Sequence, residues 1–188
     1  MGTLRYLVLG FLLIFFGYAV LHRLFERDFR RYGRLSPIVT VLGSLVFFAW
    51  GGFPMVYVVA DWPVVHVGFA LYILGSILLW GGLAVMFIGI AQLGLWRAFG
   101  RRKNVLIQHG FYRVSRNPQI VGCALYGVGF AILWPSWYAL GWVLMLAFLL
   151  HVMVLTEEAH LRRTFGKTYE EYCNRVARYV GWRWGKTK

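Results

Sequence analysis

The sequence predicts an all-α, polytopic membrane protein with about five transmembrane helices and a C-terminal amphipathic helix on the cytoplasmic side. Of its 188 residues 60% are hydrophobic and only 14% are charged, whereas a soluble domain of this size needs a more polar surface. The hydrophobic residues stand in unbroken runs of membrane-spanning length rather than in an alternating pattern. Lys and Arg gather between pairs of these runs, as they do in cytoplasmic loops.

The charge pattern also predicts the orientation. Basic clusters lie at residues 23–34, at 97–116 and after residue 160. We therefore expect an integral protein of the inner (cytoplasmic) membrane with the N-terminus outside and these clusters inside. The net charge of +13 is explained by this topology and by attraction to anionic lipid headgroups, so no nucleic-acid partner is expected.

The first two spans are expected at residues 4–21 and 38–60. The motif Ser36-Pro37 is typical of a helix start, because proline fits the first helical turn. Gly51-Gly52-Phe53-Pro54 predicts a kink near the outer end of the second span. Asp61-Trp62-Pro63 then predicts an external turn, because it combines an interfacial tryptophan with the absence of basic residues.

The third span, at residues 64–90, has glycines spaced by seven residues, at positions 68, 75, 82 and 89. This spacing returns to nearly the same face of a helix, so it predicts a face without side chains on which another helix packs closely. A groove for a lipid tail is the functional alternative.

The rest of the chain is expected to form a cytoplasmic connection, a helical hairpin and a tail. The connection, residues 91–118, contains the basic anchor Arg97, Arg101, Arg102 and Lys103. Pro118 opens the fourth span at 119–133, and Trp134-Pro135-Ser136-Trp137 turns the chain into the fifth span at 138–155. Residues 157–178 predict a basic amphipathic helix lying on the membrane. We divide the chain into residues 1–96, the N-terminal spans, and 97–188, the catalytic core.

Two polar stretches at the same predicted level of the membrane form the candidate site. One is residues 109–119 and the other is the pair Glu157 and Glu158, at opposite ends of the short hairpin. Together they supply two carboxylates, two guanidinium groups (Arg113 and Arg116), and polar side chains of the types that suit a zwitterionic ligand: His109, Tyr112, Asn117 and Gln119. A basic juxtamembrane loop with surface ion pairs is the alternative explanation.

These stretches resemble the signatures of a family of membrane-embedded methyltransferases. Residues 110–122, GFYRVSRNPQIVG, are similar to its pattern G-x-Y-R-x-x-R-H-P-x-x-x-G. Residues 157–172 match its pattern E-E-x-x-L-x-x-x-F-G-x-x-Y-x-x-Y. The family contains the isoprenylcysteine carboxyl methyltransferases and the phospholipid N-methyltransferases.

The resemblance implies S-adenosylmethionine as the methyl donor, bound on the cytoplasmic face. By analogy the cofactor-binding candidates are His109, Gly110, Tyr112, Arg116, Asn117, Pro118 and Glu157. Glu158 and Arg178 are the catalytic candidates, either at the reacting end of the acceptor or as residues that orient the site. The acceptor implied is a lipophilic small molecule or lipid that reaches the site from the bilayer. Methyl transfer needs positioning and exclusion of water, and no metal is expected.

Two departures from the family pattern leave the acceptor open. Asn117 stands where the family often has histidine, and Met153 and Val154 stand where prenylcysteine enzymes tend to have an arginine. A prenylcysteine carboxylate, a phospholipid amine and a small thiol or amine all remain candidates. Two rival classes are an NADPH-dependent sterol reductase, for which the chain is too short, and a non-catalytic lipid-binding membrane protein.

His160 and the two cysteines are further candidates for a ligand or a disulfide partner. Glu157-x-x-His160 is half of a dimetal motif whose second half is missing, so no metal site is expected. Cys123 and Cys173 fall at different levels of the predicted topology, so no disulfide is expected between them.

Overall fold

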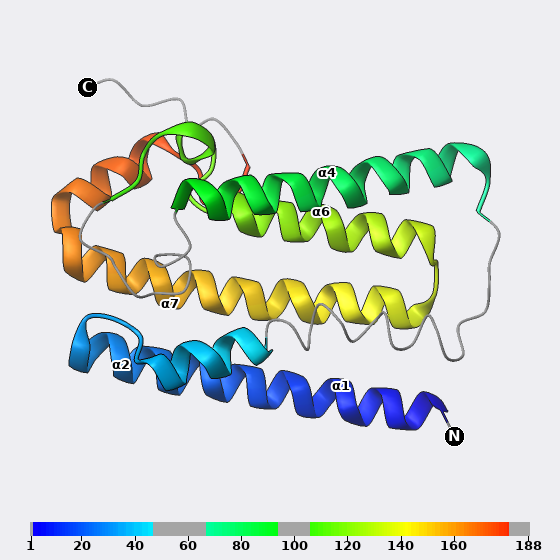
Figure 1. Ribbon diagram of the computed structural model, residues 1–188, viewed down its shortest axis with the longest axis horizontal. Helices are drawn as coiled ribbons and strands as arrows, with labels where there is room; N and C mark the ends of the chain where they lie inside the picture. The colour runs from blue at the N-terminus through cyan, green and yellow to red at the C-terminus, as the bar shows by residue number, and fades with distance from the viewer. Residues whose placement is uncertain (1, 47–66, 94–105, 181–188) are drawn as a thin grey trace.

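The computed structural model describes residues 2–46, 67–93 and 106–180, and within these ranges the chain is helical. Helices run side by side along one long axis (Figure 1). Their order is α1 (Gly2–Ala19), a π-helical turn (Val20–Leu24), α2 (Phe25–Tyr32), a helix at Pro37–Val46, α4 (Phe69–Leu93), a 3₁₀ turn (Gly110–Arg113), α6 (Pro118–Leu133) and α7 (Trp137–Arg175). The β-structure in the described residues is a single bridge between Ser115 and Ala177.

Three helical segments are long and apolar enough to cross a membrane: Val8–Tyr32, Phe69–Leu93 and Trp137–Arg175. Between 20% and 33% of the most apolar window of each is buried inside the protein, so their apolar side chains mostly face outward. Two shorter apolar helices, Pro37–Val46 and Pro118–Leu133, accompany them. The predicted kink at 51–54, the turn at 61–63 and the basic anchor at 97–103 lie outside the described residues.

The first helix continues through the basic cluster that was expected to follow it. A π-helical turn joins α1 to α2, and Gly33, with φ of 63°, ends α2. The arginines of α2 are exposed, whereas Asp28 and Phe29 are buried. The Asp28 carboxylate accepts hydrogen bonds from the Ser36 backbone N–H at 2.9 Å and from its hydroxyl at 2.6 Å. The predicted helix start at Ser36-Pro37 is thereby confirmed.

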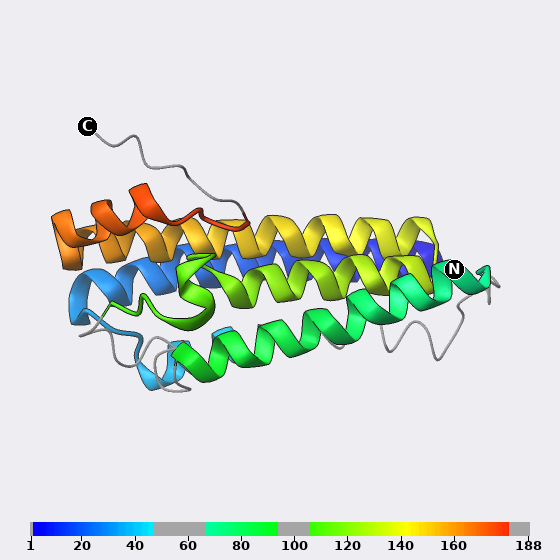
Figure 2. The ribbon, with the colours of Figure 1, turned by 90° about the horizontal axis from the view of Figure 1, so that it is seen from above.

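Helices α4 and α6 cross with almost no side chains between them. A Cβ added to Gly82 would lie 2.4 Å from the backbone nitrogen of Tyr126, and one added to Gly122 would lie 2.4 Å from that of Met86. Both views show α6 between α4 and α7 (Figures 1 and 2). The predicted packing role of the glycine face is confirmed for Gly75, Gly82 and Gly89, which are buried against α6; Gly68 faces open space.

Helices α6 and α7 form the predicted hairpin. The Ser136 hydroxyl accepts a hydrogen bond from the Ala139 backbone N–H at 3.0 Å and caps α7. Phe130 and Trp142 are fully buried, with ring centroids 5.3 Å apart and the rings edge to face. The hydrophobic core of the described residues therefore lies between these two helices.

Helix α7 has no boundary near residue 157, where a separate tail helix was expected to begin. It runs from Trp137 past both glutamates and reverses only at Gly166, whose φ of 50° and ψ of −125° are not helical. The chain after Gly166 then folds back beside α7 (orange to red in Figure 1). This reversal brings the end of α7 over the start of α6.

Candidate functional site

The stretch 109–119 is held against the end of α4 by a tight turn. Gly110 has φ of 60°, a conformation that side chains disfavour. A Cβ at this position would lie 2.5 Å from the Gln92 side-chain oxygen. That same oxygen accepts a hydrogen bond from the Phe111 backbone N–H at 2.8 Å. The glycine therefore lets the loop approach α4 closely enough to form this bond.

Tyr112 connects the loop to three other segments. Its hydroxyl is 3.0 Å from the Gln119 side-chain oxygen on α6 and 3.3 Å from the Gly89 carbonyl on α4. Its own carbonyl accepts a hydrogen bond from the Tyr172 hydroxyl at 2.7 Å. Burial raises the pKa of Tyr112 well above the usual value for tyrosine. The phenol thus stays neutral and keeps donating.

The segment after α7 lies along residues 115–117 and is attached mainly through its backbone. The Ala177 carbonyl accepts a hydrogen bond from the Arg116 N–H at 2.9 Å. The Arg178 carbonyl accepts one from the Asn117 side-chain amide at 3.1 Å. The amide of Asn117, which replaces the family histidine, therefore holds the tail.

A buried carboxylate joins two arginines from distant parts of the chain. Glu158 Oε1 lies 3.1 Å from Arg116 Nη1, and the Arg178 guanidinium contacts both Glu158 oxygens, at 3.1 and 2.9 Å. The Arg116 and Glu158 side chains are only 6% and 4% exposed. Hydrogen bonding to Glu158 raises the pKa of Arg178, and guanidinium groups carry a positive charge in proteins. We refer to Arg116, Glu158 and Arg178 as the charged triad.

Within the described residues, one buried donor of the charged triad has no partner. Arg116 Nη1 also contacts the Cys173 sulfur, but Arg116 Nε is buried and has no hydrogen-bond partner among the described residues. Two cations and one anion give the charged triad a formal charge of +1. An orphaned N–H beside an excess positive charge favours an anionic ligand atom.

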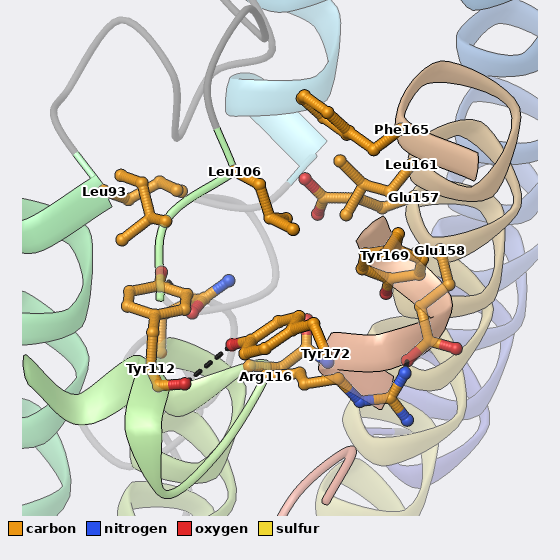
Figure 3. Close-up of a pocket in the computed structure, with 13 residues that line it drawn as sticks. Leu93, Leu106, Tyr112, Arg116, Glu157, Glu158, Leu161, Phe165, Tyr169 and Tyr172 are labelled. Carbon is orange, nitrogen blue, oxygen red and sulfur yellow. Dashed lines mark hydrogen bonds and ion pairs between the residues drawn. The ribbon is translucent and has the colours of Figure 1, made fainter. Parts of the chain in front are cut away.

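A pocket opens beside the charged triad, between the ends of α4 and α7. It encloses about 620 Å³, counting the part open to solvent. Glu157 lies beside Leu161 and Phe165, and Arg116 and Tyr172 lie on the other side (Figure 3). The lining residues are Leu93, Leu106, Ile107, Tyr112, Arg116, Asn117, Gln119, Glu157, Glu158, Leu161, Phe165, Tyr169 and Tyr172.

The predicted site residues divide into two groups. Tyr112, Arg116, Asn117, Glu157 and Glu158 all line the pocket. The other four are not part of its lining: Arg178 lies behind Glu158, His109 is exposed, Gly110 forms the turn, and Pro118 is buried in the first turn of α6. Roles in ligand contact stay predictions for all nine.

Sequence reasoning did not assign the apolar and aromatic lining to the site. Leu161, Phe165, Tyr169 and Tyr172 belong to the family pattern at 157–172 and to the expected amphipathic helix, where their three- and four-residue spacing was the available signal. Leu161 and Phe165 come before the reversal at Gly166 and the two tyrosines after it, and all four line the pocket (Figure 3).

The pocket offers complementary charges and no cluster suited to a metal. Glu157 points into it from α7 (Figure 3), opposite the excess positive charge of the charged triad. His160 stacks on Phe29 at a centroid distance of 4.4 Å, away from the pocket lining. Within the described ranges no three His, Cys, Asp or Glu side chains converge as metal ligands, and both cysteines are buried free thiols.

Comparisons with known proteins find a family model and two named relatives. The model of the phospholipid methyltransferase family matches residues 64–168, more than half of the chain. Two proteins of rice, from Oryza sativa subsp. indica and subsp. japonica, are each 31% identical over 116 residues and are each named a probable protein-S-isoprenylcysteine O-methyltransferase. The match covers 61% of this chain and 60% of each rice protein, so the chain spans less than two thirds of these curated relatives. No solved structure matches.

Proposed function

The chain belongs to the phospholipid methyltransferase family, and on that premise we propose that it is an S-adenosylmethionine-dependent membrane methyltransferase acting on a lipophilic acceptor. The observation that carries the proposal is the pocket itself. Its lining includes a carboxylate, Glu157, and on the opposite side a guanidinium, Arg116, whose buried Nε has no partner among the described residues, together with apolar side chains. A zwitterion attached to a less polar group is the ligand that fits this arrangement.

The methionine end of S-adenosylmethionine is such a zwitterion. Glu157 is suited to its ammonium group, and Arg116 Nε is suited to its carboxylate, because charge-assisted hydrogen bonds are the strongest that side chains make. Tyr169, Tyr172 and Phe165 are aromatic surfaces on which a flat ring can stack. When bound, the donor would supply a methyl group on a cationic sulfur, which takes the C–S electron pair as the acceptor's lone pair forms the new bond to carbon.

The apolar wall supports a lipophilic acceptor. Leu93, Leu106, Leu161 and Phe165 border the pocket on the side opposite the charged triad (Figure 3). A lipid chain held there would lose water contact while its reacting head lay beside Glu158. In this proposal Glu158 orients the acceptor, and the low-polarity surroundings keep water away from the reaction.

Two acceptor types are supported by different observations. The name of the rice relatives favours a prenylcysteine-type carboxylate. The family description favours an amine-bearing phospholipid headgroup, and so does the core packing of Met153 and Val154, where prenylcysteine enzymes tend to have an arginine. We propose the prenylcysteine-type acceptor as the first to test, with the phospholipid amine and a small thiol or amine as alternatives.

The proposed topology has five spans, with the N-terminus outside and the pocket on the cytoplasmic face of the inner membrane. Exposed arginines on α2 and the basic residues after Leu161 lie at the same end of the molecule as the pocket (Figure 1). The positive-inside rule places that end in the cytoplasm. Residues 97–188 are proposed as the catalytic core, and the segment from Glu157 onward supplies its amphipathic side.

Calorimetric binding to the detergent-purified protein tests the proposal. S-adenosylmethionine and S-adenosylhomocysteine should each bind the wild type, and Glu157→Ala should weaken binding at least about tenfold, the value of one charge-assisted hydrogen bond. Glu171→Ala is the matched control, because Glu171 is exposed on the same helix and does not line the pocket. It should bind as the wild type does.

Two outcomes contradict the proposal. Absence of binding of either molecule to folded wild-type protein would overturn the methyltransferase function. Salt-sensitive binding of anionic vesicles that is indifferent to Glu157 would favour a non-catalytic lipid-binding protein instead.

A further inference from the structure

We propose that Arg178 is a positioning residue, which fixes the Glu158 carboxylate and, through it, holds the Arg116 guanidinium ready to receive an anion in the pocket. The inference rests on the proposed function and deepens it, because it assigns Arg178 a role away from the reacting atoms. The sequence prediction left two roles open for Arg178, contact with the reacting end of the acceptor or orientation of the site, and the geometry favours the second.

The geometry of Arg178 supports an indirect role. Its guanidinium does not line the pocket, and it uses Nε and Nη2 to bind both oxygens of Glu158, at 3.1 and 2.9 Å. A two-point contact between planar groups fixes orientation as well as distance. The Glu158 carboxylate is thus set in one plane by a residue outside the pocket.

Glu158 in turn determines where Arg116 can point. Arg116 Nη1 is held 3.1 Å from Glu158 Oε1 and also contacts the Cys173 sulfur, so these two contacts use the same guanidinium nitrogen. Arg116 Nε remains buried without a partner in the part of the chain that is described. A pocket residue whose guanidinium is fixed on one side and unsatisfied on another is preorganised for an anion.

The side chain of Arg178 can be separated from the attachment of the tail. The tail is joined to residues 116 and 117 by the carbonyls of Ala177 and Arg178, at 2.9 and 3.1 Å. These bonds involve backbone acceptors, so they persist when the Arg178 side chain is replaced. A substitution there should alter the orientation of Glu158 while the tail stays in place.

The test is calorimetric titration of S-adenosylhomocysteine into wild type, Arg178→Met, Arg178→Lys and Arg175→Met. Arg178→Met should weaken binding about tenfold, the size expected for coupled neighbouring groups. Arg178→Lys keeps the charge but not the two-point contact, so it should fall between wild type and Arg178→Met. Arg175→Met is the matched control: Arg175 is exposed on the same tail and bonds only Gln108 in the described chain, so its affinity should stay within about twofold.

A double-mutant cycle distinguishes positioning from general loss of structure. If Arg178 acts through Glu158, the Kd of Arg178→Met/Glu158→Gln should equal that of Glu158→Gln alone. Effects that multiply, or an Arg178→Lys protein that binds as tightly as the wild type, would overturn the inference. If Arg178→Met does not fold, as judged by its melting temperature, Arg178→Lys and its combination with Glu158→Gln give the same decision.

The same titrations separate this inference from the proposed function. Wild-type protein that binds no S-adenosylhomocysteine would overturn both. Wild-type binding with an unchanged Kd in Arg178→Met would overturn the positioning role and leave the proposed function intact.

Discussion

The crossing of α4 with α6 and the junction of the loop with the tail are both tightly packed, but by opposite means. At the crossing, glycines remove side chains so that two backbones touch: a Cβ on Gly82, Gly122 or Gly129 would come within 2.4 Å of a backbone nitrogen. At the junction, long polar side chains reach across to carbonyls and to the Glu158 carboxylate. The first depends on dispersion and shape alone, and the second on directed bonds.

The difference separates stability from function. Membrane helices gain little from burying apolar surface, so a close backbone approach supplies much of their association energy. Such a contact tolerates no added atoms, but it offers no ionisable or hydrogen-bonding side chain to a ligand. The junction is built from ionisable and hydrogen-bonding groups, so it can bind a ligand, and changes there should affect affinity as well as stability.

The largest loss of folding stability is expected where α4 and α6 cross. Gly82→Leu should abolish folding or cost more than about 4 kcal/mol, because the new side chain must separate two backbones. Gly81→Leu is the control, since Gly81 is exposed on the same helix with no atom within 4 Å of the added Cβ. Thermal unfolding in detergent measures both. Equal melting temperatures for the two variants would contradict the packing role of the glycine face.

An intermediate loss of folding stability is expected at the charged triad. Glu158→Ala leaves two guanidinium groups without their shared carboxylate, which should cost about 2–4 kcal/mol. The lower end of that range allows for solvent screening of Arg178, whose side chain is 34% exposed. Denaturant titration measures the loss, with the exposed Glu170→Ala as control. A loss no larger than the control's would mean that the charged triad is not held in the folded protein.

The smallest effect is expected at Tyr112. Tyr112→Phe removes one hydroxyl and should cost about 1–2 kcal/mol, measured by thermal unfolding at pH 8. Because burial raises the pKa of Tyr112, its hydroxyl stabilises the fold fully below the unfolded pKa of about 10. That contribution is lost as the pH rises above 10.

The dependence of folding stability on pH provides a second test of Tyr112. The decline in stability above pH 10 should be shallower in Tyr112→Phe than in the wild type, and unchanged in Tyr32→Phe, where the ring is 55% exposed. A decline of equal steepness in all three proteins would show that Tyr112 ionises as readily folded as unfolded.

Sequence patterns predicted the structure correctly where a residue type has a single physical consequence. The glycine spacing predicted the helix crossing, Pro118 predicted the start of α6, and the polar turn after Leu133 predicted the hairpin. The meeting of residues 109–119 with Glu157 and Glu158 also followed, because a short hairpin returns the chain to the same level. The structure confirms each of these.

Other features could not be predicted because hydropathy does not mark helix ends. The helix that begins as α7 passes from apolar to charged residues at Glu157 without interruption, and it ends only where Gly166 adopts a positive φ. The partners of Asp28 and Tyr112 depend on contacts eight to 60 residues away along the chain. Those contacts exist only after the helices have packed, so no local pattern encodes them.

The reversal at Gly166 also sets the order in which the molecule can be completed. The bond from Asn117 to the Arg178 carbonyl spans 61 residues, and the bond from Tyr172 to the Tyr112 carbonyl spans 60. During synthesis the loop at 109–117 therefore waits, without its tail partners, until the whole hairpin and the turn after it have been made. Closing a loop of this length costs little more entropy than closing one half as long, so the delay is one of sequence order rather than of energy. The lining of the pocket is therefore completed only when the residues after Gly166 have been made.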